Sequence, residues 1–225
     1  MIMLERLQKA IARSGMYSRR EAERLITHGK VSVNGKIVSE LGTQIDPGKD
    51  IIKIDGRKVI IRKDKIVIAF YKPRKCLCTS SDPEGRPVIM DFLPKDYRGL
   101  KIAGRLDFNM TGLVILTNDG ELANRLTHPR FGSTRIYTIK LKKPSEDKQL
   151  DKIGKDILSV RNLADSWIEV KIRCGVEKKL FYLFLKAGIM PEKVKRIAIG
   201  SIKLGKLQPG EFRRLIPDEI KELSV

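Results

Sequence analysis

Apolar side chains in the first thirty residues are spaced for two short helices. Leu4, Leu7 and Ile11 recur every three or four residues, which places them on one face of a helix. Ser18 and Glu21 have the spacing of a capping box, in which each side chain bonds a free backbone N–H at the start of a helix. The pattern therefore predicts two helices, closed by the glycines at positions 15 and 29.

The apolar spacing then changes to the alternation that is typical of strands. Residues 30–33 and 36–38 alternate in this way, and Asn34-Gly35 stands between them. Asn-Gly tolerates the positive φ angles that a two-residue hairpin turn requires. We predict a hairpin here, and a small helix-helix-hairpin domain over residues 1–60.

A longer region of mixed strand and helix patterns follows a charged linker at residues 61–65. Strand-like segments occur at 66–71, 112–117, 135–141, 167–172 and 194–202, and helix-like segments at 121–126 and 179–186. Strands and helices do not alternate regularly, as they would in a doubly wound sheet. The pattern favours an α+β domain on a mostly antiparallel mixed sheet over residues 66–225.

The net charge of the chain restricts the classes of partner that it can bind. Lys and Arg number 46 against 27 Asp and Glu, a formal net charge of +19, and such a surplus attracts phosphate backbones. RNA, DNA and an anionic membrane surface all fit. The membrane fits least, because no apolar run approaches the roughly 20 residues that span a bilayer and no signal peptide is recognisable. We expect a cytoplasmic protein, and disfavour a DNA-binding regulator because no convincing recognition helix is present.

Basic residues gather on the predicted N-terminal helices and the turn that follows them. A solvated helix face would explain a single run of charges, but here most acidic partners are missing, which favours a nucleic-acid surface. The basic positions are Arg6, Lys9, Arg13, Arg19, Arg20, Arg24 and Lys30.

Few residues can carry covalent chemistry, and Asp107 is the most prominent of them. It ends the run Gly104-Arg105-Leu106-Asp107 and precedes an Asn/Thr/Gly turn. A carboxylate can be a base, a nucleophile, a metal ligand or a salt-bridge partner, and spacing alone favours a turn aspartate that caps backbone N–H groups. The two histidines and three cysteines have no metal-site or triad spacing, so we predict no bound metal and buried free thiols at Cys76, Cys78 and Cys174.

The N-terminal pattern resembles a small RNA-binding domain of the S-four type, over about residues 4–59. The resemblance implies a module that reads RNA shape with its two-helix face, and it assigns RNA contacts to Arg6, Arg19, Arg20 and Lys30. The matching runs are Glu5-Arg6-Leu7, Ser18-Arg19-Arg20-Glu21-Ala22 and Gly29-Lys30-Val31-Ser32-Val33-Asn34-Gly35.

The remaining motifs, in order and spacing, resemble the ribosomal RNA pseudouridine synthases that carry such an N-terminal domain. Lys72 and Arg86 lie within the matched motifs and are assigned to RNA binding. The motifs are Tyr71-Lys72-Pro73, Ser81-Asp82-Pro83-Glu84-Gly85-Arg86-Pro87-Val88, Asp91-Phe92-Leu93-Pro94, Gly104-Arg105-Leu106-Asp107, Thr111-Gly112-Leu113, Thr117-Asn118-Asp119-Gly120, His128-Pro129 and Arg135-Ile136-Tyr137.

The resemblance implies isomerisation of a uridine in folded ribosomal RNA, without a cofactor and by an enzyme that we expect to be a monomer. Asp107 would be the essential carboxylate, attacking the anomeric carbon or ring carbon 6, or assisting a glycal-like intermediate. Arg105 would contact the displaced strand or take the place of the flipped base; a plain phosphate contact is equally compatible. Tyr137 would stack on the target uracil and assist proton removal from carbon 5, although core packing is the ordinary role of such a strand residue.

One family element is imperfect in this chain. The family places a basic partner of the catalytic aspartate on a late helix, and here Phe181 and Tyr182 stand at the usual basic pair. Lys178 or Lys179 is the candidate substitute, because a lysine stem is long and flexible. The alternative function is a catalytically weak or silent RNA-binding factor in ribosome assembly.

Overall fold

The computed structural model describes residues 4–61, 64–145, 149–150, 153, 157–164 and 166–223, without the side chain of Lys178. The chain divides into two compact units. Unit 1 comprises Met1–Lys65 with Leu93–Leu100, and unit 2 comprises Ile66–Phe92 with Lys101–Val225.

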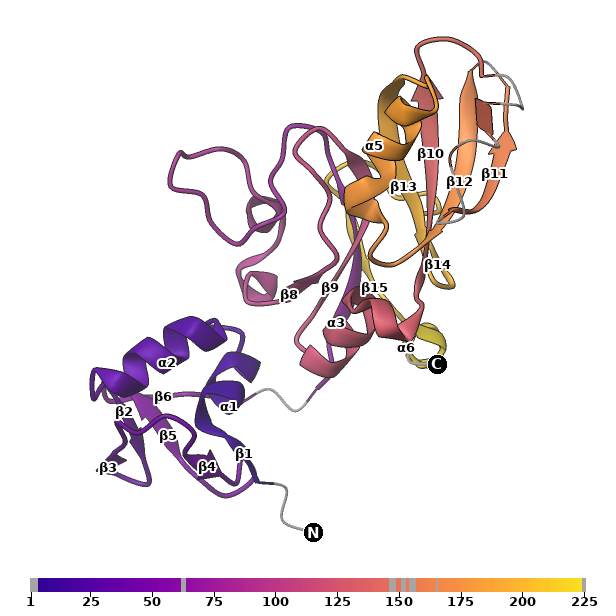
Figure 1. The fold of residues 1–225 in the computed structure, drawn as a ribbon. Coiled ribbons are helices and arrows are strands. Elements are labelled where there is room, and N and C mark those ends of the chain that lie inside the picture. The colour runs from indigo at the N-terminus through magenta and orange to yellow at the C-terminus, as the bar shows by residue number, and fades with distance from the viewer. Residues whose placement is uncertain are drawn as a thin grey trace. The chain divides into compact units, whose positions relative to one another are not determined.

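Unit 1 holds two helices and a four-stranded antiparallel sheet (Figure 1). The helices are α1 (Leu7–Arg13) and α2 (Arg19–Thr27). The strand order is β3-β2-β5-β6, with β2 at Val31–Val33, β3 at Lys36–Ile37, β5 at Ile52–Ile54 and β6 at Arg57–Lys58. A separate pair joins β1 (Glu5–Arg6) to β4 (Gln44–Ile45).

Local signals in the sequence explain how α2 begins and how β2 turns into β3. The N–H of Glu21 donates to Ser18 Oγ at 3.2 Å, and the N–H of Ser18 donates to Glu21 Oε2 at 3.4 Å, which confirms the capping box. Asn34 and Gly35 have φ angles of 50° and 84°, as the predicted hairpin turn requires.

The core of unit 1 lies between the two helices and the sheet. Leu4, predicted as a helix-face residue, is exposed, because the helix begins only at Leu7. The buried residues that pack together are Leu7, Ala10, Ile11, Ala22, Ile26, Val31, Ile45, Ile52, Ile54 and Val59.

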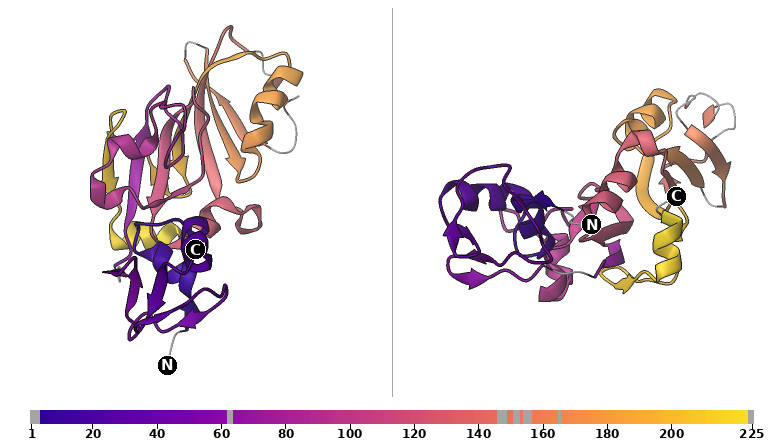
Figure 2. Two further views of the ribbon diagram at one scale, coloured as in Figure 1. Left: turned by 90° about the vertical axis from the view of Figure 1, so that its left-hand side faces the viewer. Right: turned by 90° about the horizontal axis from the view of Figure 1, so that it is seen from below.

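Unit 2 is built on a nine-stranded sheet in which β11-β12-β10-β13-β9-β7-β15 lie side by side, with β14 on β13 and β8 on β9. Among the described strands β13 pairs parallel with β9, and the other pairs are antiparallel. The strands are β7 (Val67–Lys72), β8 (Lys101–Ala103), β9 (Thr111–Thr117), β10 (Thr134–Leu141), β11 (Ile157–Asn162), β12 (Trp167–Arg173), β13 (Pro191–Ile199), β14 (Ile202–Lys203) and β15 (Phe212–Arg214). The predicted α+β fold on a mostly antiparallel mixed sheet is confirmed, and Figure 2 shows the sheet from two further sides.

Helices α3 (Gly120–Thr127) and α6 (Pro217–Leu223) cover one face of β7 and β9. The longer helix α5 spans Glu177–Lys186, and short 3-10 turns occupy Ile89–Phe92, Lys95–Tyr97 and Pro129–Phe131. β7 is buried at every position, which explains its unbroken apolar run. Among the described helices none has the length and apolar character that crossing a bilayer demands.

The strand predicted over residues 194–202 is wrong in its extent. β13 begins earlier, at Pro191, and stops at Ile199, after which the chain reverses and pairs with itself through β14. Gly200 makes this reversal possible with a φ of 54°, which a glycine adopts without strain.

Candidate active site

Asp107 lies in a short loop between two paired strands. This Asp107 loop, residues 104–110, connects β8 to β9. The side chains of Asp107 and Arg105 are exposed, whereas Leu106 between them is buried. The N–H of Met110 donates to the carbonyl of Asp107 at 3.1 Å and closes the turn. The loop therefore holds two charged side chains outward on either side of an apolar anchor.

Lys72, at the end of β7, holds the second half of the loop from within. Its side chain is 0 % exposed, and Nζ donates to Phe108 O at 3.3 Å, Met110 O at 2.7 Å and Pro73 O at 2.9 Å. Burial lowers the pKa of Lys72, and the negative charge of Asp107 is among the groups that oppose this shift. The RNA contact predicted for Lys72 is corrected here, because a buried ammonium with its donors already used supports the loop instead.

Arg196, on β13, holds the first half of the loop. Its guanidinium is fully buried and donates to Leu113 O at 2.7 Å, Gly104 O at 2.9 Å and Arg105 O at 3.4 Å, with Tyr137 Oη at 3.5 Å from Nη1. Sequence reasoning missed this residue. The signal was its place in the strand pattern, since alternation puts Arg196 on the same face as a buried alanine two residues later.

Tyr137 lies on β10 with its ring 1 % exposed. Burial raises the pKa of its phenol, and the charge of Arg196 opposes that shift, so the hydroxyl is neutral near pH 7. The stacking on uracil expected for Tyr137 stays a prediction. What the structure shows is a buried ring whose hydroxyl lies beside the guanidinium under the Asp107 loop.

Cys76, Cys78 and Cys174 are buried free thiols, which confirms that prediction. The N–H of Leu106, inside the Asp107 loop, donates to Cys78 Sγ at 3.3 Å. Burial raises the pKa of Cys76 to about 11 and also raises the pKa values of Cys78 and Cys174. In the part of the chain that the structure describes, no group of three or more His, Cys, Asp or Glu could hold a metal.

Arg86 is exposed, but its guanidinium already has partners. Nε and Nη2 donate to the two carboxylate oxygens of Asp82 at 3.0 and 2.8 Å, and Nη1 lies 3.1 Å from Glu84 Oε2. The hydrogen bond from Arg86 lowers the pKa of Asp82. Arg86 thus ties its own loop together, and its predicted RNA contact requires it to exchange these carboxylates for phosphate.

Helix α5 holds the two positions, 181 and 182, at which the resemblance predicts basic residues. Lys179 is exposed, and Phe181 and Tyr182 are 46 % and 63 % exposed. The side chain of Lys178 lies outside the described residues, so pairing of Asp107 with either lysine stays a prediction. Glu177, at the start of the helix, directs Oε1 to 3.6 Å from Nε of the buried Arg135, an ion pair without a hydrogen bond.

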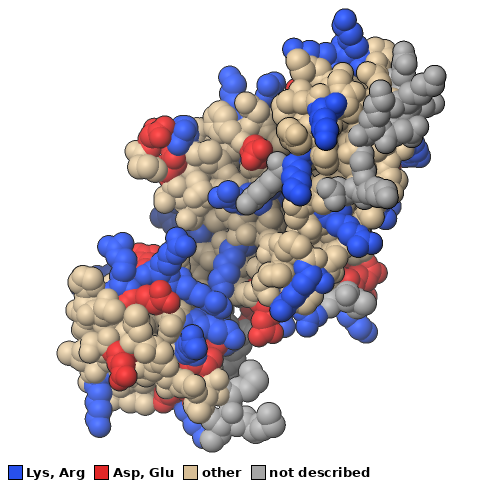
Figure 3. Space-filling view, in the orientation of Figure 1, with Lys and Arg blue, Asp and Glu red and all other residues tan. Residues whose placement is uncertain are grey.

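The four RNA-contact candidates of unit 1, Arg6, Arg19, Arg20 and Lys30, are all exposed. Arg19 and Arg20 form the first turn of α2. Blue Lys and Arg side chains are more widespread than red Asp and Glu side chains on the visible face (Figure 3). Both units therefore offer positive surface to a polyanion.

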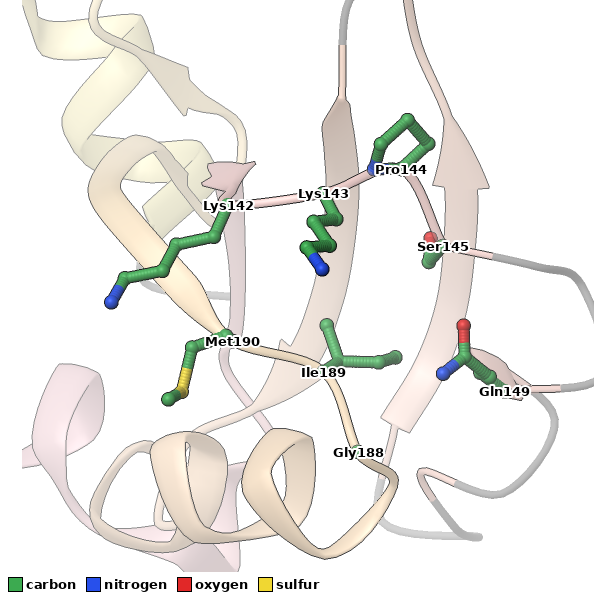
Figure 4. A pocket seen from close by; sticks show the side chains of 8 residues that line it. All are labelled: Lys142, Lys143, Pro144, Ser145, Gln149, Gly188, Ile189 and Met190. Carbon is green, nitrogen blue, oxygen red and sulfur yellow. The ribbon is translucent and has the colours of Figure 1, made fainter.

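A pocket of about 330 Å³ lies elsewhere in unit 2, where the chain leaves β10 and enters β13 (Figure 4). Its walls hold none of the predicted site residues. They are Lys142, Lys143, Pro144, Ser145, Gln149, Gly188, Ile189 and Met190.

The two units of the fold each match a known protein family. The S4 domain family matches residues 5–51, and the RNA pseudouridylate synthase family matches residues 66–178. The chain belongs to the RNA pseudouridine synthases, isomerases that act on RNA.

Relatives align over almost the entire chain. A ribosomal large subunit pseudouridine synthase B of Bacillus subtilis (strain 168) is 37% identical, covering 98% of this chain and 96% of the relative. An uncharacterized RNA pseudouridine synthase of Mycobacterium leprae (strain TN) is 36% identical, covering 97% of this chain and 91% of the relative. A crystal structure of a pseudouridylate synthase superposes with a TM-score of 0.69 at 29% identity, covering 97% of this chain and 99% of that one.

Proposed function

We propose that the protein converts a specific uridine of ribosomal RNA to pseudouridine, with Asp107 as the essential carboxylate. The bond from ribose carbon 1′ to ring nitrogen 1 breaks, the uracil turns, and carbon 1′ bonds to ring carbon 5. Carbon 5 loses its proton and nitrogen 1 gains one, so atoms and electrons balance without a cofactor. The relative named as a large-subunit ribosomal enzyme supports ribosomal RNA as the substrate.

The single observation that carries the proposal is the setting of Asp107. Its carboxylate is exposed on a loop whose backbone is tied from inside to two buried cations, Lys72 and Arg196. Attack on carbon 1′, attack on carbon 6 and assistance to a glycal intermediate all require a carboxylate that can reach the sugar or the base. The loop thus presents an exposed carboxyl group, on a backbone that is held from within, to the sugar or base that approaches it.

Reaching a uridine inside folded RNA requires that the nucleotide leave its stack. Arg105 is exposed two residues before Asp107, and we assign it to contact with the displaced strand or its phosphate. We assign docking of the structured RNA to the domain at residues 1–60, through Arg6, Arg19, Arg20 and Lys30, and the chemistry to the domain at residues 66–225, joined by the linker 61–65. A monomer suffices for this division, because the residues assigned to chemistry lie on one chain.

The test measures tritium release from carbon 5 of uridine-labelled large-subunit and small-subunit ribosomal RNA. The wild-type protein should release tritium and D107N should not, because an amide can neither attack carbon nor accept a proton. D218N is the matched control, since Asp218 is an exposed aspartate on α6. Wild-type RNA binding without any release would replace the proposal with the silent assembly factor.

A further inference from the structure

Arg196 meets the backbone of the Asp107 loop directly, and we infer that it is a positioning residue for the isomerisation. The inference rests on the function proposed for Asp107. It states that the Arg196 guanidinium sets the direction of that carboxylate by fixing the loop backbone that precedes it. Arg196 would do this without touching RNA, because its side chain is fully buried.

The backbone of Arg196 is itself held tightly. It pairs in parallel with Gly112 across β13 and β9, and a Cβ atom added at Gly112 would overlap the carbonyl oxygen of Arg196. Such a contact leaves no room for any residue but glycine. The side chain therefore starts from a fixed point in the centre of the sheet.

From this point the guanidinium reaches two separate pieces of chain. Nε donates to Leu113 O on β9, while Nη2 and Nη1 donate to Gly104 O and Arg105 O in the loop. Gly104 crosses over the cation with a φ of 88°, a conformation that glycine adopts readily. The planar fork thus joins strand and loop in one rigid unit, and bonds from a charged donor are stronger than neutral ones.

Arg196 and Lys72 divide the loop between them. Arg196 binds the carbonyls of residues 104 and 105, and Lys72 binds those of residues 108 and 110, so Asp107 stands between the two sets of bonds. If the first set is lost, the carboxylate keeps its charge and exposure but gains freedom of direction. Catalysis depends on that direction, whereas RNA affinity does not.

The decisive variant is Arg196→Lys. It keeps a buried positive charge, but its single ammonium nitrogen cannot reproduce three nitrogens spread over a planar fork. Arg135→Lys is the matched control: Arg135 is equally buried on β10, and its hydrogen bonds end on Leu126, Ser133 and Thr134 rather than on the loop. Arg196→Gln is a second, neutral variant of the same position.

Two readouts separate positioning from general stability. Amide hydrogen exchange should be at least ~10-fold faster over residues 104–110 in R196K than in wild type or R135K, while β7 and β10 keep their protection. The single-turnover rate on ribosomal RNA should fall about 100-fold in R196K, with the apparent RNA dissociation constant changed by less than about threefold. The exchange measurement needs no active enzyme, so a failure of the proposed function would not hide its result.

Several outcomes would overturn the inference. If amide exchange over residues 104–110 is as slow in R196K as in wild type, the guanidinium does not order the loop. If the single-turnover rate of R196K equals that of wild type, the order of the loop does not matter for turnover. Equal losses in R135K and R196K would mean a shared effect of buried arginines. If R196K and R196Q both fail to fold at room temperature while R135K folds, Arg196 is only a structural residue of the sheet.

Discussion

At the scale of single residues, the site depends on charges that are hidden rather than displayed. An ammonium or guanidinium taken out of water is costly unless every donor finds an acceptor. Lys72 has three N–H donors and three carbonyl partners, and Arg196 ends on three carbonyls and one hydroxyl. These carbonyls come from the Asp107 loop, from Pro73 directly after β7 and from Leu113 in β9. The hydrogen bonds of the two buried cations can therefore form only when the loop is correctly folded.

Cys76 allows a pH prediction at the same scale. Burial raises the pKa of its thiol from 9.0 to about 11. Between these two pH values the thiol of the unfolded chain loses its proton, whereas the thiol of the native protein keeps it. Stability conferred by the neutral thiol is present below pH 9 and is lost as the pH rises toward 11. Urea unfolding should show C76A less stable than wild type at neutral pH, and this difference should shrink by about 1 kcal/mol or more near pH 10.

Measuring the stability difference between C76A and wild type at both pH values separates the effect of thiol ionisation from the effect of lost packing. Removing the sulfur leaves a cavity whose cost does not depend on pH. A constant difference between C76A and wild type at both pH values would therefore contradict the raised pKa.

At the scale of elements, the sequence predicts what is set locally and misses what is set at a distance. The capping box at Ser18 and the turn at Asn34-Gly35 are local, and both are confirmed. Arg196 was missed because a cation is expected at the surface, and its carbonyl partners lie 83, 91 and 92 residues away in the chain. Lys72 was misjudged for the same reason, with partners 36 and 38 residues away.

Helix α5 supports a prediction about the missing basic partner. Phe181 stands where the resemblance predicts a basic residue. It is 46 % exposed, so Phe181→Lys should change the free energy of unfolding by no more than about 0.5 kcal/mol. If the resemblance holds at this position, a cation placed there should raise the single-turnover rate on ribosomal RNA, because it supplies the opposite charge that the resemblance pairs with Asp107. Y182K, at the 63 % exposed neighbour, is the control for added charge. Equal rates in F181K, Y182K and wild type would show that this enzyme does not use the helix position.

At the scale of the whole molecule, the surplus of positive charge governs encounter with RNA more than chemistry. A net charge of +19 over 225 residues is shared by exposed side chains on both units. Each phosphate contact releases condensed counterions, so affinity falls steeply as salt rises. Such contacts bring the RNA to the protein but carry little sequence information, whereas under the proposed function turnover depends on the geometry around Asp107.

This separation predicts different effects from two pairs of exposed basic residues in unit 1. The double variant R19A/R20A, at the first turn of α2, should lower the slope of log affinity against log salt by about 1.5, since each phosphate contact contributes ~0.7–0.9. R57A/K58A on β6 removes the same charge from another exposed site and should change the slope much less. Filter binding over a salt series measures both.

At saturating RNA the turnover of R19A/R20A should equal that of wild type, because the loop that holds Asp107 is untouched. If both pairs lower the slope equally, α2 attracts RNA only as diffuse charge and docks nothing, which would refute the role assigned to its first turn.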